Sequence, residues 1–293
     1  MSGWDISDIP DQAGRTFIVT GANSGLGAAT ARALAGAGAK VIMACRNEVK
    51  ARAVADRIGP NAQVRRLDLA DLASVHEFAD SVDGADVLIN NAGVMAVPLK
   101  RTAEGFEMQI GTNHLGHFAL TGLLLDKIRD RVVTLSSGMH AIGRIDLEDL
   151  DWERRSYQRW AAYGQSKLAN LMFARELQRR LTAAGSAKLS VAAHPGYAAT
   201  DLQGHTESIY DTLMSIGNRL FAQSAEMGAL PTLFAATAEV EPGGFYGPTG
   251  LRGMRGYPGP SPSSAASKDE VTARRLWELS EQLTKVSYPF VRR

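Results

Sequence analysis

The chain has 293 residues, of which 45% are hydrophobic and 22% are charged, and its formal net charge is +1. This composition is that of an ordinary soluble globular protein, and the near-neutral charge gives no electrostatic case for a nucleic-acid or membrane-surface partner. Cys45 is the only cysteine, so neither an intrachain disulfide nor a thiolate metal cluster is possible, which fits a reducing cytoplasm.

No targeting or membrane signal is recognisable in the sequence. Residues 1–14 carry three aspartates and lack the basic start and the apolar stretch of a signal peptide. No apolar run approaches the roughly 18 residues of a membrane span. We therefore expect a cytoplasmic protein that contacts neither nucleic acid nor membrane.

Short apolar runs alternate with helical patterns along the chain. Six runs are predicted to be strands: Arg15–Thr20, Lys40–Cys45, Ala62–Leu69, Asp86–Gly93, Arg131–Ser137 and Leu189–Gly196. Helix-like spacing of apolar residues marks the segments Ala28–Ala35, Asn47–Ile58, Leu72–Val82, Glu104–Ile128 and Tyr163–Leu181. This alternation predicts a parallel sheet with helices on both faces.

The remainder of the chain contains no linker that would divide it. The charged stretch Asp146–Trp160 is predicted to be an inserted loop. Residues 200–224 interrupt the alternation with an apolar, helix-like segment, so we expect a lid there. Gly253–Ser267 is predicted to be irregular and Lys268–Lys285 to be a terminal helix. We therefore predict a single α/β domain over residues 1–293, a Rossmann-type doubly wound sheet.

Three glycines follow the first predicted strand, in the stretch TGANSGLG from Thr20 to Gly27. Ligands of a doubly wound sheet bind beyond the carboxyl ends of its strands, where the first turn of a helix points free N–H groups at an anion. Gly21 permits the sharp turn, while Gly25 and Gly27 leave room for a phosphate and for close helix packing. The stretch therefore predicts a pyrophosphate site, with a tight turn that binds nothing as the alternative.

Five further motifs follow in order: NNAG at Asn90–Gly93, NHLGHF with Asn113, TLSS with Ser136 and Ser137, YGQSK with Tyr163 and Lys167, and HPGYAAT with Pro195, Gly196 and Thr200. Together with TGANSGLG they resemble the classical short-chain dehydrogenases/reductases, from about residue 14 to about residue 250. The strings ACRN, NHLGHF and GGFYGPTG look most like the retinol-dehydrogenase-like branch. The resemblance implies an oxidoreductase that uses a nicotinamide cofactor.

Tyr163 and Lys167 are four residues apart and share one helix face. Interconverting an alcohol and a carbonyl needs a group that takes up and releases the hydroxyl proton, and a nearby ammonium makes tyrosine a better base by lowering its pKa. In isolation, a packed tyrosine and a solvated lysine are common at this spacing. The resemblance implies that Tyr163 is the acid/base and that Lys167 lowers its pKa and holds the nicotinamide ribose.

The resemblance supplies two further catalytic roles. Ser137 would hydrogen-bond the substrate oxygen, although Ser136 offers the same chemistry and only the family pattern favours the second serine of the pair. Asn113 would support a water-linked proton path to Lys167, whereas a helix-interior asparagine can also bond its own backbone.

The residues after the second predicted strand bear on the choice of cofactor. NAD-preferring sites usually carry an acid there, which accepts from the ribose 2′-OH, but this strand ends in Cys45, Arg46 and Asn47. Arg46 can pair with a 2′-phosphate, so we predict NADP(H), with NAD(H) possible; a solvated surface arginine is the alternative. By resemblance, the cofactor-binding set comprises Gly21, Asn23, Ser24, Gly25, Leu26, Gly27, Arg46, Asp68, Leu69, Asn90, Ala92, Gly93, Tyr163, Lys167, Pro195, Gly196 and Thr200.

The substrate side is predicted to be largely apolar. The lid and four residues are expected to surround the open side of the nicotinamide: Met139, His140, Trp160 and Tyr197. Such a pocket favours a small apolar carbonyl or alcohol, although a surface helix packed on the core is the alternative for the lid. His114 and His117 have no acidic or thiol partner nearby, so no metal site is predicted.

Two rival functions use the same fold. Related epimerases and dehydratases share Tyr-x-x-x-Lys but usually have another glycine spacing and a larger carboxyl-terminal domain. An NADP(H)-binding redox sensor needs the glycine loop but not the acid/base set, and cofactor binding without turnover would favour it. Family members also form homodimers and homotetramers through the helices that correspond to residues 113–128 and 163–181, so either assembly is open to this chain.

Overall fold

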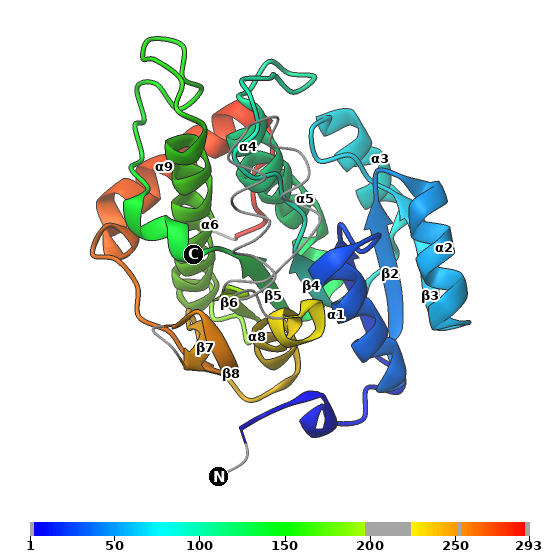
Figure 1. Ribbon diagram of the computed structural model, residues 1–293. Helices are drawn as coiled ribbons and strands as arrows, with labels where there is room; N and C mark the ends of the chain where they lie inside the picture. Colours follow the sequence, from blue (N-terminus) through cyan, green and yellow to red (C-terminus); the bar gives the residue numbers. More distant parts are fainter. Residues whose placement is uncertain (1–2, 197–223, 251–252, 291–293) are drawn as a thin grey trace, which may run out of the picture.

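The computed structural model describes residues 3–196, 224–250 and 253–290. Its eight-stranded sheet has the order β3-β2-β1-β4-β5-β6-β7-β8, so the chain winds outward from β1 in both directions (Figure 1). Neighbouring strands from β3 to β7 are parallel, whereas β8 pairs antiparallel with β7. The predicted doubly wound α/β fold is confirmed, with one antiparallel strand added at its edge.

The strands are β1 (Thr16–Thr20), β2 (Lys40–Cys45), β3 (Ala62–Arg66), β4 (Ala85–Asn90), β5 (Ile128–Leu135), β6 (Leu189–Ala193), β7 (Phe245–Gly250) and β8 (Arg255–Pro260). The α-helices are α1 (Gly25–Gly36), α2 (Glu48–Ile58), α3 (Leu72–Ser81), α4 (Met108–Ile110), α5 (Gly116–Leu124), α6 (Arg159–Ala183), α8 (Ala225–Thr237) and α9 (Glu270–Thr284). Shorter turns are η1 (Ile6–Asp8), η2 (Gly111–Leu115), η3 (Leu125–Lys127), η4 (Gly138–Ile142) and η7 (Ala266–Lys268), of which η2 is π-helical.

Helices cover both faces of the sheet, which is why its strands lack polar alternation. Within β1, Phe17 and Val19 pack into a core with residues of α1, α2 and α8, while Ile18 packs into the opposite core with residues of α3, α5, α6 and α9. All three side chains are fully buried. The two cores clamp the sheet and fix where each strand ends.

Several parts of the chain differ from the sequence expectation: β7 and α8 have no counterpart among the predicted elements, and two predicted segments have another structure. The segment predicted to be irregular, Gly253–Ser267, contains β8, because pairing with β7 imposes an extended backbone on a glycine- and proline-rich stretch at the sheet edge. The single helix expected over Glu104–Ile128 is divided: it begins at Met108, passes through the π-helical turn η2 and ends at Leu124. Ile128 already belongs to β5, where it is buried beside Ala85.

The last helix, α9, packs against α5 and α6 (Figure 1). Trp277 of α9 lies 5.0 Å from the Phe118 ring and 5.7 Å from the Phe173 ring, measured between ring centroids. Beyond α9, the Tyr288 hydroxyl donates a hydrogen bond of 2.8 Å to the Phe118 carbonyl. The chain therefore covers part of the α5 and α6 surface that the expected homo-oligomers would use.

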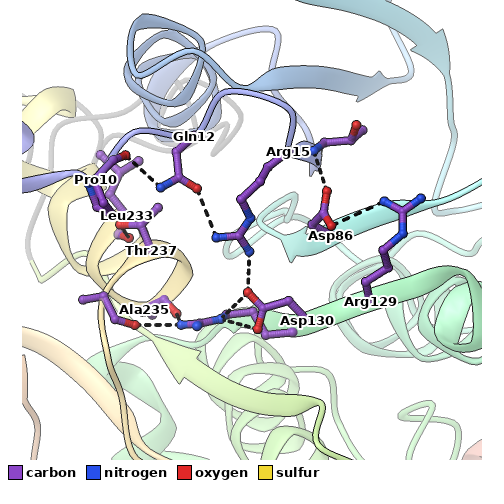
Figure 2. A network of polar contacts seen from close by, with 12 residues as sticks. Pro10, Gln12, Arg15, Asp86, Arg129, Asp130, Leu233, Ala235 and Thr237 are labelled. Carbon is purple, nitrogen blue, oxygen red and sulfur yellow. Dashed lines mark hydrogen bonds and ion pairs between the residues drawn. The ribbon is translucent and has the colours of Figure 1, made fainter.

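Charged side chains close the amino ends of the strands (Figure 2). Arg15 pairs with Asp130 and donates to Gln12. Arg131 pairs with Asp130 at 3.2 Å and donates to the carbonyls of Ala235 and Ala238, at 3.1 Å and 2.9 Å, at the end of α8. These contacts join β1 and β5 to α8.

Candidate active site

The carboxyl ends of β1, β4 and β5 lie side by side, because these strands are parallel neighbours. The loop after β1 crosses this edge before α1 begins at Gly25. Gly21 and Gly25 have φ angles of +67° and +51°, which residues with side chains rarely adopt. A Cβ atom on Gly27 would lie only 2.4 Å from the Gly21 carbonyl oxygen. The glycines are therefore required for the turn and for the close approach of α1.

The amino end of α1 offers a cradle for an anion. Ser24 is the N-cap of α1 but makes no side-chain hydrogen bond to the helix. The first N–H groups of a helix have no intrahelical partner and lie at the positive end of its dipole. A phosphate group fits such an end, and the bare glycine backbone leaves it room. The residues present thus fit the pyrophosphate of a dinucleotide.

Arg46 is the free cation at the end of β2. It is exposed and makes no ion pair within the ranges that the structure describes. Its neighbour Asn47 is occupied, since its side chain accepts from the Lys50 N–H at 3.0 Å and caps α2. Burial raises the pKa of the Cys45 thiol to about 12, so that thiol is neutral and has no nucleophilic role. Arg46 remains as the group there that can meet a ligand phosphate.

Tyr163 and Lys167 are both buried on α6, and the Lys167 Nζ atom lies 5.8 Å from the centroid of the Tyr163 ring. Burial raises the pKa of Tyr163 to about 12, against the opposing effect of its hydrogen bond with Ser137. Burial also lowers the pKa of Lys167 to about 8, while Nζ donates to the Leu135 carbonyl at 3.2 Å. The sequence predicts that the Lys167 ammonium lowers the pKa of Tyr163; in the structure, burial raises that pKa instead.

The two serines at the end of β5 have different surroundings. Ser136 is buried and its hydroxyl donates to the Lys167 carbonyl at 2.7 Å. Ser137 is partly exposed, acts to lower the pKa of Tyr163, and accepts from the Met139 N–H at 3.2 Å. Since the Ser136 hydroxyl is already committed to α6, the geometry favours Ser137 as the serine that can meet a substrate.

Asn113 lies in the π-helical turn η2, a kind of irregularity that is frequent at functional sites. Its side chain accepts from the Val94 N–H at 2.8 Å and donates to the Val94 carbonyl and to Ser166 Oγ, both at 2.9 Å. A Cβ atom on Gly93 would lie 3.1 Å from Asn113 Oδ1 and 3.4 Å from Lys167 Nζ. Asn113, Lys167 and the NNAG strand end therefore meet at one point.

The other predicted cofactor residues have more varied positions. Asn90 is fully buried, and its side chain donates to Thr121 Oγ1 of α5 at 2.9 Å, so we assign it to holding β4 against α5. Ala92 donates its N–H to Thr20 Oγ1 at 2.9 Å beside the glycine loop. Asp68 Oδ1 accepts from the Ala70 N–H at 3.0 Å and shapes the turn after β3, in which Leu69 is buried.

The predicted substrate residues divide into two groups. Met139 is partly exposed beside Ser137, and Trp160 is 39% exposed with its ring edge-on to Tyr163 at 6.4 Å. His140 is only 4% exposed, and both its ring nitrogens are hydrogen-bonded: Nδ1 to the Ser137 carbonyl and Nε2 to the Ser264 N–H. His140 therefore joins Ser137 to the segment after β8 and has no free ring nitrogen for a substrate.

The end of β6 carries the last motif. Gly196 has a φ of +67° and donates its N–H to His194 Nδ1 at 3.2 Å, which shapes the turn after Pro195. Tyr197, Thr200 and all of the expected lid except Ser224 lie outside the described residues. Ser224 is the N-cap of α8.

Comparison with known proteins places this geometry in a family. The model of the family described as short chain dehydrogenase matches residues 15–210. The chain belongs to the short-chain dehydrogenases. Among them, human retinol dehydrogenase 13 is 42% identical over 298 residues, covering 95% of this chain and 87% of the relative. Human retinol dehydrogenase 12 is 40% identical and covers 94% of this chain and 88% of the relative. The sequence is thus retinol-dehydrogenase-like, as its motifs suggested.

Solved structures of short-chain dehydrogenases agree with the fold. The crystal structure of an uncharacterized protein from Mycobacterium paratuberculosis has a TM-score of 0.87 and 53% identity, covering 98% of this chain and 100% of that one. A protein from Beutenbergia cavernae, described as an NAD(P)-dependent gluconate 5-dehydrogenase, was crystallised with NADP; it has a TM-score of 0.60 and 27% identity over 78% of this chain and 92% of that one. The family therefore binds nicotinamide dinucleotides.

Two negative findings apply to the described part of the short-chain dehydrogenase chain. No helix there is both long and apolar enough to cross a membrane. No group of three or more histidine, cysteine or acidic side chains there is arranged to hold a metal ion.

Proposed function

We propose that the protein is an NADP(H)-dependent oxidoreductase that interconverts an apolar carbonyl and its alcohol, with Tyr163 as the acid/base. The observation that carries the proposal is the position of one buried phenol. Tyr163 lies near enough to Ser137 for that hydroxyl to lower its pKa, lies one helical turn from Lys167, and shares the edge of the sheet with the glycine loop. A dinucleotide-binding loop needs none of these three side chains, whereas proton transfer to a carbonyl oxygen does.

The cofactor fits the residues at this edge. Its pyrophosphate would lie at the amino end of α1, over the bare backbone of Gly21, Gly25 and Gly27, and when bound the nicotinamide supplies or accepts the hydride. The exposed guanidinium of Arg46, with no ion-pair partner among the described residues, supports NADP(H) over NAD(H). Pro195, Gly196 and Thr200 would lie near the carboxamide, as the family resemblance implies.

The side chains of this site divide the proton chemistry among them. During carbonyl reduction, Ser137 orients the substrate oxygen and Tyr163 donates its phenolic proton to that oxygen. A Tyr163 pKa of about 12 keeps this proton in place at neutral pH, which suits reduction. Alcohol oxidation needs the Tyr163 phenolate, so a positive charge must come closer to Tyr163 when the protein oxidises an alcohol. Lys167, with a pKa of about 8, is charged at neutral pH and can provide it.

Three features support an apolar substrate. Met139 and Trp160 flank Ser137 and Tyr163, and the sequence of residues 200–224 carries apolar residues at helix-like spacing. The curated relatives are named for retinol, an apolar alcohol. We propose that this chain accepts apolar aldehydes, ketones or alcohols of that general kind and works in the cytoplasm.

A panel assay tests the proposal directly. Purified protein would be given NADPH and a series of apolar aldehydes and ketones, and NADPH oxidation would be followed by absorbance, with Tyr163→Phe measured alongside. We expect wild-type turnover with at least one substrate and a loss of about 1,000-fold or more in the variant, since general acid catalysis is worth roughly 100- to 10,000-fold. NADPH affinity should change less than threefold.

The outcomes separate the two main functions. Equal turnover by Tyr163→Phe would contradict the acid/base role. Tight NADPH binding without turnover on any substrate, and without turnover of the corresponding alcohols with NADP, would favour a redox sensor.

A further inference from the structure

A continuous chain of buried hydrogen bonds runs from the glycine loop to the helix of Tyr163. Thr20 Oγ1 lies 2.9 Å from His117 Nε2, and His117 Nδ1 lies 2.9 Å from the Asn113 carbonyl oxygen. The Asn113 side chain then donates to Ser166 Oγ at 2.9 Å, and Ser166 Oγ donates to the Tyr163 carbonyl at 2.8 Å. The four linking side chains, those of Thr20, His117, Asn113 and Ser166, are at most 1% exposed.

We propose that His117 is a positioning residue, which sets the cofactor loop and the proton-transfer residues in a fixed relation through this chain. The inference rests on the proposed function, since it assigns a task to a residue that touches neither substrate nor cofactor.

Counting donors and acceptors fixes the direction of each bond. Thr20 Oγ1 accepts from the N–H groups of Asn91 and Ala92, both at 2.9 Å, and these fill its two lone pairs. The threonine proton therefore points to His117 Nε2 at 2.9 Å, because the other acceptor, the Ile89 carbonyl, is 3.4 Å away. A neutral imidazole that accepts at Nε2 carries its proton on Nδ1. His117 thus donates from Nδ1 to the Asn113 carbonyl.

The surroundings hold His117 in this neutral form. Burial lowers its pKa to about 4, and the nearby Lys167 charge acts in the same direction, although the hydrogen bond to Asn113 opposes both. A charged ring would have a second N–H pointing at the threonine hydroxyl, which already accepts two. A single tautomer therefore satisfies every group in the chain.

Each half of the ring holds a different part of the site. On the Nε2 side, Thr20 ends β1 and its backbone carbonyl accepts from the Asn91 side chain at 2.7 Å, next to the turn at Gly21. On the Nδ1 side, Asn113 clamps Val94 and reaches Ser166, three residues after Tyr163 on α6. Losing the first contact should disturb the glycine loop, and losing the second should disturb Tyr163 and Lys167.

Two variants of His117 separate these contacts. In His117→Asn, the amide nitrogen takes the place of Nδ1 and retains the donor to Asn113, while the acceptor for Thr20 is lost. In His117→Gln, the amide end takes the place of Nε2 and retains the acceptor for Thr20, while the donor to Asn113 is lost. For each variant, the dissociation constant of NADPH would be measured by fluorescence, and kcat and KM with the best substrate from the panel.

Opposite patterns are expected. His117→Asn should weaken NADPH binding about tenfold with kcat within threefold of wild type, because a buried hydrogen bond left unmade costs about that much. His117→Gln should lower kcat about tenfold with NADPH binding within threefold. Thr20→Ser, which retains the hydroxyl, should resemble wild type. Thr20→Val also removes the acceptor for the Asn91 and Ala92 N–H groups, so it should weaken NADPH binding at least as much as His117→Asn.

Several results would overturn the proposal. Wild-type NADPH binding and kcat in both folded His117 variants would show that the chain transmits nothing. Equal losses of both quantities, in proportion to a lower melting temperature, would indicate a merely structural histidine. If the His117 variants do not fold, Thr20→Val with unchanged NADPH affinity would equally contradict the proposal. NADPH binding is measured without turnover, so an inactive wild-type protein would contradict the proposed function alone.

Discussion

The two ends of the parallel strands differ in whether their charged groups already have partners. At the amino ends, every charge in the network of Figure 2 has a partner: Arg15 and Arg131 share Asp130, and Arg129 pairs with Asp86. At the carboxyl ends, Tyr163 and Lys167 are buried, and burial shifts the pKa of each toward its neutral form. Arg46 is exposed there and has no ion-pair partner among the described residues. The same sheet is thus closed at one end and open at the other.

The difference shows where binding capacity lies. A network whose donors and acceptors are satisfied contributes stability and has nothing left for a ligand. The glycine loop, the uncapped amino end of α1 and Arg46 are all groups whose partners are still to come. Active sites of doubly wound sheets lie at the carboxyl edge for this reason.

Replacing an arginine at the carboxyl ends of the strands should affect cofactor binding and leave stability unchanged, whereas replacing one at the amino ends should do the reverse. Arg46→Asp should weaken NADP(H) binding about 10- to 100-fold, because a charge-assisted contact to the 2′-phosphate is replaced by repulsion. NAD(H) binding should change less than threefold, and the melting temperature should stay within about 1 °C. Fluorescence titration with NADPH and NADH, together with a thermal melt, would measure all three quantities.

A charge-matched control lies on α2, the helix that follows Arg46. Arg57→Asp changes the net charge equally but lies in the last turn of α2, away from the carboxyl edge. It should leave the cofactor preference unchanged. An unaltered NADPH-to-NADH ratio in Arg46→Asp would remove Arg46 from the cofactor site.

Acid should lower the free energy of unfolding through two buried histidines. Burial lowers the pKa of His117 to about 4 and that of His194 to about 4, against about 6.5 in an unfolded chain. Between these values the unfolded chain binds more protons, so the free energy of unfolding is full above pH 6.5 and falls as the pH drops toward 4. Urea unfolding at pH 7.5, 6, 5 and 4.5 would show this decline.

The histidine variants give the matching control. His76→Asn removes an exposed histidine of α3 and should leave the slope unchanged, whereas His117→Asn should make the slope shallower, since His194 still contributes. A free energy of unfolding that stays constant from pH 7.5 to 4.5 would contradict the buried, neutral state of these rings.

The smallest effect is expected at the closed end. Arg131→Ala removes a partly buried ion pair and two hydrogen bonds to the end of α8, which should cost about 1–3 kcal/mol and lower the melting temperature by about 3–8 °C. NADPH affinity and kcat at 25 °C should stay within twofold. The exposed pair provides the control, since Arg129→Ala should shift the melt by less than about 2 °C. Loss of cofactor binding in Arg131→Ala would show that the two ends are not independent.

Much of the fold could be predicted because its central strands are buried on both faces. Runs such as KVIMAC must then be apolar throughout, and they stand out in the sequence. β7 and β8 could not be found in this way, since FYGPTG and RGYPGP are extended only because each pairs with a neighbour. The division of residues 104–128 was hidden too, because Leu125 and Ile128 continue the helix-like spacing of apolar residues beyond the end of α5.

Only the parts of the site that short local motifs encode could be predicted from the sequence. Glycine spacing and Tyr-x-x-x-Lys are local, and the structure brings them to one edge. The state of His140 depends on Ser264, which is 124 residues away in the chain. The choice between Ser136 and Ser137 depends on which hydroxyl is already bonded to the backbone of α6, and that hydroxyl belongs to Ser136. The raised pKa of Tyr163 depends on burial by several elements. The i, i+4 spacing of Asn113 and His117 was the one local signal left unused.

The covering of α5 and α6 by α9 has a consequence for synthesis on the ribosome. Phe118 and Tyr288 form their hydrogen bond across 170 residues of chain. A chain made from its amino terminus can complete the Tyr163 helix and strands β1 to β6 long before Trp277 and Tyr288 exist. Until these residues emerge, an apolar strip on α5 and α6 faces water, and the newly made chain needs protection from aggregation there.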